Sequence, residues 1–320
     1  MKNFKKALIA LLALSFVLAV SCATTAGSKT AKQKASLEKT QERMLWKISG
    51  TDKNGEPSTV YVQGTIHLGD DRLVVSDNVK RLFLGADRRI GEIASEDYPK
   101  IQEKTIEMMI ESAKAAGNKD FRDELTQEQN AFLENLFPKE TLAQYALFEP
   151  WVTNLLITSS IMVTAGLDAE KALDSYFVNY AAANGLSTQG LDKLETQLDF
   201  IKFGDWNDQM GLLSETIDSL AKPEELEKSS KEIIDMYEAY INDDVAKTAE
   251  VIDSSKKYET AIQKRYNKML WEDRNAAWAK LIEQYLNDGG TTFIFAGTGH
   301  FVGKESVFTA MQKNKTLKIR

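Results

Sequence analysis

Segments typical of β-strands lie near both ends of this chain, and a long stretch with helical periodicity separates them. The strand patterns cover residues 44–49, 59–66, 89–94, 292–296 and 316–319. The helical stretch runs from about residue 98 to about residue 288. The simplest packing joins the two β regions in one sheet and leaves the helices as an insertion. We therefore predict an α/β fold, with a mixed sheet built from the N- and C-terminal segments and a large, mostly helical insertion.

Several local signals predict where these elements begin and end. Asn54-Gly55 between two strand patterns is a strong hairpin signal. Ser76 is placed to cap a helix, and Thr126 with Gln129 forms a capping-box sequence. Gly289-Gly290 is expected to end the last helix of the insertion.

The N-terminal residues predict export. Residues 1–21 combine an early cluster of lysines with an apolar stretch that is short for a membrane-spanning helix, as in a signal peptide. Cys22 is the only cysteine in the chain, and its position after a small residue resembles a lipobox. The alternative is a plain secretory signal followed by an incidental cysteine. We expect an exported lipoprotein, anchored to a membrane through a lipid on Cys22, in the periplasm or on the cell surface.

The segment after Cys22 differs in composition from the rest of the chain. Residues 22–42 are mostly small or polar and predict a flexible tether, because such a segment buries little apolar surface. Residues 43–320 are then expected to form the folded domain. Without residues 1–21 the chain has 37 basic and 47 acidic residues, a net charge of −10. This charge and the lack of a basic stripe argue against a nucleic-acid partner.

The two histidines are the most informative side chains. They are the only histidines in the chain, and each ends a GxxH motif at the end of a predicted strand. The motifs are Gly64-Thr65-Ile66-His67 and Gly297-Thr298-Gly299-His300. Ligand sites of α/β sheets form where parallel strands end, and imidazole is both a metal ligand and an acid–base group. Either histidine alone could serve only its own loop, but the repeated pattern predicts that His67 and His300 lie side by side in one site.

At these motifs the chain resembles the TraB/GumN family, which includes the Tiki proteases and the pheromone-shutdown protein TraB. The resemblance extends from about residue 44 to the C-terminus. The segments that carry it are residues 62–70, 86–92, 148–151, 190–197, 274–275 and 296–303. The last of these, Ala296-Gly297-Thr298-Gly299-His300-Phe301-Val302-Gly303, is close to the family's closing motif.

The resemblance implies roles for individual residues. His67 and His300 would be metal ligands, Glu92 a third ligand or the general base, and Arg274 a group that binds a carboxylate or polarises a carbonyl. Such a set would hold a divalent metal ion, with Mn, Co and Zn all compatible with the ligand types. The metal would lower the pKa of a bound water, which would then attack a carbonyl group.

Plainer interpretations remain open at this point. Glu92 lies among charged neighbours and could be a surface residue, and Arg274 could lie on a solvated helix face. For the whole protein, the first hypothesis is a metal-dependent, peptidase-like hydrolase that acts on a peptide or another small molecule. The alternative is a non-enzymatic lipoprotein that binds a peptide or small ligand, since the chain lacks an HExxH sequence, a serine elbow and a nucleophilic cysteine.

Overall fold

The structure is a computed structural model, and it describes residues 35–117, 119–254 and 260–319. Its strands form a seven-stranded sheet in the order β5-β4-β6-β3-β2-β1-β7. They are β1 (Ala35–Lys39), β2 (Leu45–Thr51), β3 (Pro57–Thr65), β4 (Arg88–Gly91), β5 (Gln189–Gly190), β6 (Gly290–Gly297) and β7 (Leu317–Ile319). Neighbours from β5 to β3 run parallel, whereas β3, β2 and β1 are antiparallel. The predicted α/β fold with a mixed sheet is confirmed.

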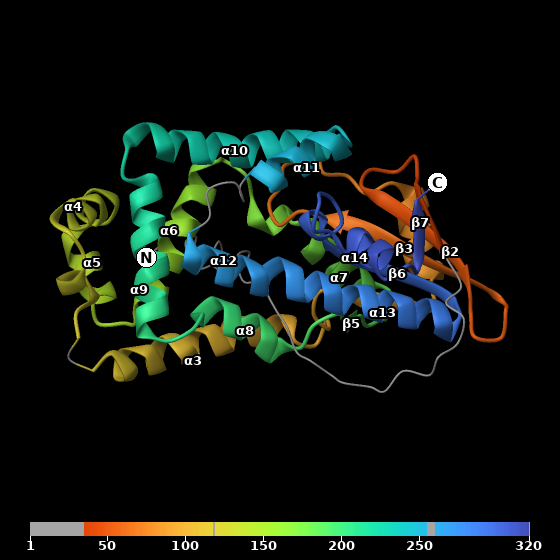
Figure 1. Cartoon of the computed structure of the whole chain (residues 1–320), viewed down its shortest axis with the longest axis horizontal. Helices are drawn as coiled ribbons and strands as arrows, with labels where there is room; N and C mark the ends of the chain where they lie inside the picture. Colours follow the sequence, from red (N-terminus) through yellow and green to blue (C-terminus); the bar gives the residue numbers. More distant parts are fainter. Residues whose placement is uncertain (1–34, 118, 255–259, 320) are drawn as a thin grey trace.

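Helices fill the chain between β4 and β6. Those inside this stretch are α3 (Tyr98–Ala116), α4 (Gln127–Leu136), α5 (Lys139–Tyr145), α6 (Pro150–Thr164), α7 (Leu173–Ala183), α8 (Leu194–Lys202), α9 (Trp206–Leu220), α10 (Pro223–Ile241), α11 (Val245–Ser254), α12 (Ala261–Asn267) and α13 (Arg274–Asp288). Outside it lie α2 (Asp77–Gly85) and α14 (Val307–Lys313). The short strand β5 lies within the helical stretch and pairs with β4, which the sequence did not predict. Figure 1 shows the sheet at one end of the molecule and helices α4, α5 and α9 at the other.

The predicted local signals are confirmed. The Ser76 side chain accepts a hydrogen bond from the Val79 N–H at the start of α2. Thr126 and Gln129 form a reciprocal capping box at the start of α4. Gly289 follows α13 with a φ of 79°, a conformation that glycine adopts without steric cost.

Helices α2 and α7 cover one face of the sheet. The Phe83 side chain of α2 and the Phe177 side chain of α7 contact Phe293 and Phe295 of β6. Residues two apart on a strand share a face, so these rings form one aromatic layer beneath the sheet.

Helices α13 and α14 cover the opposite face. Ile294 lies between the two phenylalanines of β6, so its side chain points to this second face. Ile294 pairs with Val62 of β3, which in turn pairs with Trp46 of β2, so all three side chains share this face. The Trp46 ring contacts Phe308 of α14. The fully buried Trp278 of α13 belongs to the same core. The sheet is therefore rigidly held between two layers, which fixes the position of its strand ends.

The prediction of a tether through residue 42 is wrong for its last part. Residues Ala35–Lys39 form β1, which lies between β2 and β7 in the sheet. Ala35 and Leu37 are buried, while Glu38 is exposed. The alternation of apolar and polar residues has the period of a strand, but the polar composition of the surrounding segment concealed it.

The rest of the predicted tether, the signal peptide and Cys22 lie outside the described residues. A second apolar core, separate from that of the sheet, lies among α4, α5, α6 and α9. Within the described parts of the chain, no helix is both long enough and apolar enough to cross a membrane.

Candidate functional site

Three parallel strands bring the predicted site residues to one edge of the sheet. Thr65, the last residue of β3, pairs in register with Gly297, the last residue of β6. Glu92 comes directly after β4, on the other side of β6. A Cβ atom on Gly297 would lie 3.2 Å from Glu92 Oε1, 3.5 Å from His67 Nε2 and 3.7 Å from His300 Cδ2. Both histidines and Glu92 therefore converge on the end of β6, where glycine allows their close approach.

The two GxxH motifs are also joined to each other directly. The Thr298 hydroxyl of the second motif donates a hydrogen bond to the Thr65 carbonyl oxygen of the first. A Cβ atom on Gly64 would lie 2.5 Å from Thr298 Oγ1, so the first glycine is required for this contact. The buried Tyr240 of α10 donates a hydrogen bond to the Gly64 carbonyl oxygen. These contacts hold the backbones of both motifs in one arrangement.

His67 is oriented by a buried aspartate that the sequence did not predict. Asp174, in the first turn of α7, places Oδ2 2.8 Å from His67 Nδ1. The Thr65 hydroxyl donates a 2.5 Å hydrogen bond to the other oxygen of Asp174. The His67 side chain is 18% exposed, whereas that of Asp174 is 2% exposed. The contact with Asp174 directs Nε2, the other ring nitrogen, toward Glu92 and the end of β6.

The same contact changes the proton affinity of both groups. Burial by itself lowers the pKa of His67, but the charge and contact of Asp174 outweigh it, so the pKa lies above its ordinary value. Burial by itself raises the pKa of Asp174, but His67 and the Thr65 hydrogen bond outweigh it, so the pKa of Asp174 is lowered. His67 thus titrates at a higher pH than an imidazole in water does.

Arg274 is the centre of a buried network at the same edge. Its guanidinium donates to Glu92 Oε2 at 2.5 Å, to Asp192 Oδ2 at 2.9 Å and to His300 Nε2 at 2.9 Å. The Arg274 side chain is 0% exposed, and that of Glu92 is 1% exposed. Glu92 is further held by the Gly297 N–H, which donates to Oε1. The alternative interpretations, in which Glu92 is a surface residue and Arg274 lies on a solvated helix face, are therefore wrong.

The contacts of His300 define its protonation state. A guanidinium can only donate, so His300 Nε2 accepts from Arg274 and carries no proton. The proton then lies on Nδ1, which is 2.7 Å from the Asn275 side-chain oxygen. The rings of Trp271 and Trp278 lie on the imidazole, with centroids 4.6 Å and 4.4 Å away. His300 is consequently a fixed, neutral imidazole.

The carboxylates around Arg274 are more basic than usual. Burial raises the pKa of Glu92, although Arg274 and His67 oppose the shift. Burial also raises the pKa of Asp192, against the opposing effects of Arg274 and the Trp278 N–H. Two buried carboxylates share the charge of one guanidinium, so the attraction of Arg274 does not offset the effect of burial at either of them.

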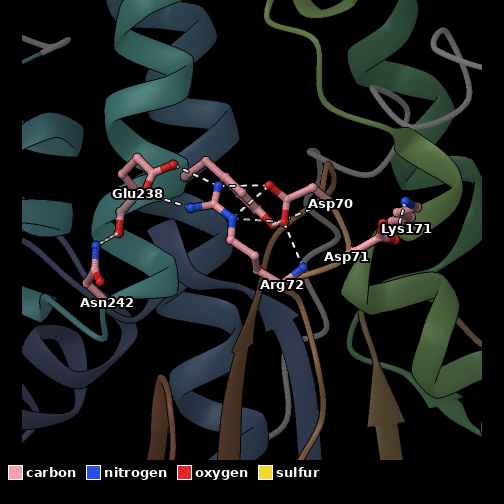
Figure 2. A network of polar contacts seen from close by, with 7 residues as sticks. Asp70, Asp71, Arg72, Lys171, Glu238 and Asn242 are labelled. Atoms are coloured by element: carbon pink, nitrogen blue, oxygen red, sulfur yellow. Dashed lines mark hydrogen bonds and ion pairs between the residues drawn. The ribbon is translucent and has the colours of Figure 1, made fainter.

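The loop after His67 is fixed by a polar network on its outer side (Figure 2). Arg72 binds Asp70 and makes a paired contact with Glu238 of α10, at 2.7 and 3.0 Å. The Tyr237 hydroxyl donates to Asp70 Oδ1 and accepts from the Asp70 N–H. Lys171 forms an ion pair with Asp71 of the same loop. Helix α10 therefore holds the loop on one side and, through Tyr240, the strand that leads into it.

The predicted ligands do not fit one shared metal ion in this arrangement. Within residues 35–117, 119–254 and 260–319, no three His, Cys, Asp or Glu side chains form a group that could hold a metal. In addition, the guanidinium of Arg274 binds His300 Nε2 and Glu92 Oε2. Those are the lone pairs that a metal would need.

The structure thus brings together all four predicted site residues, His67, Glu92, Arg274 and His300. Asp174 and Asp192 were missed. Asp192 lies in a segment that the family resemblance already included, next to Gly190 and Leu191. Asp174 had no signal beyond an acidic residue at a helix start, which usually only favours the helix dipole.

Comparison with known proteins gives one family and one relative. The model of the family described as TraB/PrgY/gumN matches residues 44–317. A protein of Treponema pallidum (strain Nichols), described as uncharacterized, is 27% identical over 284 residues, which cover 87% of this chain and 82% of the relative. No solved structure matches the chain significantly.

Proposed function

The chain belongs to the TraB/PrgY/gumN family, and from this membership and the geometry of the site we propose that it is a peptidase-like hydrolase in which His67 is the general base. The observation that carries the proposal is the contact of His67 with Asp174, because it combines an orienting carboxylate with an imidazole that is 18% exposed. The side chains of Glu92, Arg274 and His300 lie behind it and are buried. A substrate at the sheet edge would therefore meet His67 first.

The chemistry follows from the position of the protons. With Nδ1–H directed at Asp174, His67 Nε2 carries a lone pair and takes a proton from water. The water oxygen then forms a bond to the peptide carbonyl carbon. The π electrons of the carbonyl move onto its oxygen during this attack and return as the carbon–nitrogen bond breaks, while His67 gives the proton to the amide nitrogen. The products are a carboxylic acid and an amine, and transfer of the second water proton from the acid to the amine makes them a carboxylate and an ammonium group. A positioned base of this kind contributes about 10²–10⁴-fold to the rate.

The test uses the purified protein and a mixture of synthetic peptides in ¹⁸O-labelled water. Hydrolysis introduces ¹⁸O into each new C-terminal carboxylate, which mass spectrometry detects. Peptides that stay intact while one of them binds to the protein would instead support the non-enzymatic binding lipoprotein. That second candidate is favoured by the many internal contacts of Arg274, whose hydrogen bonds go to Glu92, Asp192 and His300. Elemental analysis of the purified protein tests the metal dependence that the family resemblance implies.

Asp174→Asn is expected to lower the pKa of His67. Burial lowers this pKa, and Asp174 makes the largest of the contributions that raise it, so removing its charge shifts the pKa downward. The imidazole pKa should therefore be lower in the variant than in the wild type, where it lies above its ordinary value. The base works only when deprotonated, so activity rises as the pH rises through the His67 pKa. In the variant this rise moves to lower pH.

NMR titration of the two imidazoles measures the pKa directly, and His67→Gln assigns the signals. The control is Asp71→Asn, a substitution in the loop after His67 at a side chain that is 96% exposed. It should leave the His67 titration unchanged. An unchanged pKa in Asp174→Asn would contradict the role of Asp174.

We also propose that the protein is exported and anchored through Cys22. The support is the sequence of residues 1–22, in which a lysine cluster and an apolar stretch precede the only cysteine. Cells grown with an alkyne fatty acid should yield labelled protein in the membrane fraction. Cys22→Ser should abolish the label and release the protein from the membrane. Equal labelling of the variant would show that Cys22 is not the anchor site.

A further inference from the structure

The guanidinium of Arg274 occupies a pocket built for a cation. Its three nitrogen atoms contact Glu92, Asp192 and His300, which come from three separate parts of the chain. Its Cζ atom lies 4.4 Å from the centre of the Trp278 ring, and the Trp278 N–H donates to Asp192. Each surrounding group thus contributes negative charge, a lone pair or a π face to the same positive charge.

The backbone before Arg274 is specialised. Residues Lys268–Asp273 form a π-helical segment directly before α13. Segments of this kind shift the register of a helix and occur often at functional sites. Here the segment contains Trp271, whose ring packs against His300, and Arg274 follows directly after the segment. The placement of Arg274 is therefore a feature of the fold and not the chance orientation of a long side chain.

We infer that Arg274 is the resident cation of this site, and that it takes the place which the family resemblance assigns to a divalent metal ion. Arg274 and a metal ion would compete for the same two donor atoms, His300 Nε2 and an oxygen of Glu92. A metal ion would need them at about 2.0–2.2 Å, where a guanidinium hydrogen cannot also lie. A divalent ion beside a buried guanidinium would also suffer like-charge repulsion.

This inference concerns the centre itself and does not depend on whether the protein hydrolyses peptides. If Arg274 is removed without a replacement charge, Glu92 and Asp192 remain buried and unpaired, with the lone pair of His300 beside them. That group offers two oxygen ligands and one nitrogen ligand, a set that zinc and cobalt accept. The metal affinity of the site is therefore expected to depend on the charge at position 274.

The experiment compares wild type, Arg274→Met and Arg274→Lys, each purified without a histidine tag. Metal content is measured by elemental analysis after incubation with Zn²⁺ and dialysis, and Co²⁺ binding is followed by its visible absorption. We expect far less than one equivalent of zinc in the wild type and in Arg274→Lys, which keeps a positive charge. Arg274→Met should bind about one equivalent, and zinc should raise its unfolding midpoint.

The wild type alone is sufficient to overturn the inference. A full equivalent of metal in the wild type that is lost in a His67→Ala, His300→Ala double variant would show that the metal binds as the family resemblance implies. This holds even if Arg274→Met fails to fold. A folded Arg274→Met that binds no Zn²⁺ or Co²⁺ would also contradict the inference, because its donors would then not form a cation site. Neither result bears on peptide hydrolysis, which the ¹⁸O assay measures separately.

Discussion

Arg274→Ala is expected to lower the free energy of unfolding by about 3–5 kcal/mol, the cost of breaking a buried ion pair by removing one partner. The guanidinium is 0% exposed and contacts Glu92, Asp192 and His300. Without it, two carboxylates stay buried with no compensating charge. The measurement is urea unfolding at neutral pH, followed by circular dichroism.

The pH dependence of this loss provides a second test. Burial already raises the pKa of Glu92 and of Asp192, and the loss of Arg274 raises both further. A carboxyl group whose folded pKa is raised binds protons more tightly in the folded state, so acidification favours folding of the variant. The difference in free energy of unfolding between the variant and the wild type should therefore shrink as the pH falls toward these pKa values.

The control is Lys280→Ala on the exposed face of α13, which should change the free energy of unfolding by no more than about 0.5 kcal/mol. If Arg274→Ala lowered the free energy of unfolding as little as Lys280→Ala does, the result would contradict the stabilising role of the buried network.

His67→Gln is expected to reduce the rate of peptide hydrolysis by about 10²–10⁴-fold, the usual contribution of a general base. Glutamine can still hydrogen-bond to Asp174, but its amide does not accept a proton from water near neutral pH. The loss should appear mainly in kcat, because proton transfer occurs in the transition state. Initial rates from the ¹⁸O assay measure it.

The control for His67→Gln is Asp71→Asn, whose side chain pairs with Lys171 on the outer surface of the same loop. It should keep wild-type activity. Thermal unfolding shows whether either variant has lost its fold. Full activity in a folded His67→Gln would exclude His67 as the base and leave the binding lipoprotein as the better proposal.

Much of the fold was predictable because its signals are local. The periods of strands and helices separated the β regions from the helical insertion, and capping residues such as Ser76 and Thr126 marked helix starts. The family resemblance, carried by short motifs in a fixed order, is confirmed by the match over residues 44–317. Strand β1 was missed because its alternating residues lie in a segment of tether-like composition.

The meeting of the two GxxH motifs was also predictable, although their contacts were not. Each histidine follows a strand end, and parallel strands end at the same edge of a sheet. The register of β3 and β6, which pairs Thr65 with Gly297, places the motifs beside each other. The metal roles that the resemblance implies for these residues stay a prediction, which the measurement of metal content tests.

The sequence by itself therefore determined the α/β zoning, the family and the residues that gather at the site. The tertiary structure alone decided how their charges pair. Arg274 meets Glu92 across 182 positions and Asp192 across 82, while Thr65 meets Asp174 across 109. No periodicity or motif specifies such pairs, because a charged side chain has the same local pattern on a solvated surface as in a buried network. Burial among α7, α13 and the strand ends removed water from these groups, and each charge then required a partner from a distant part of the chain.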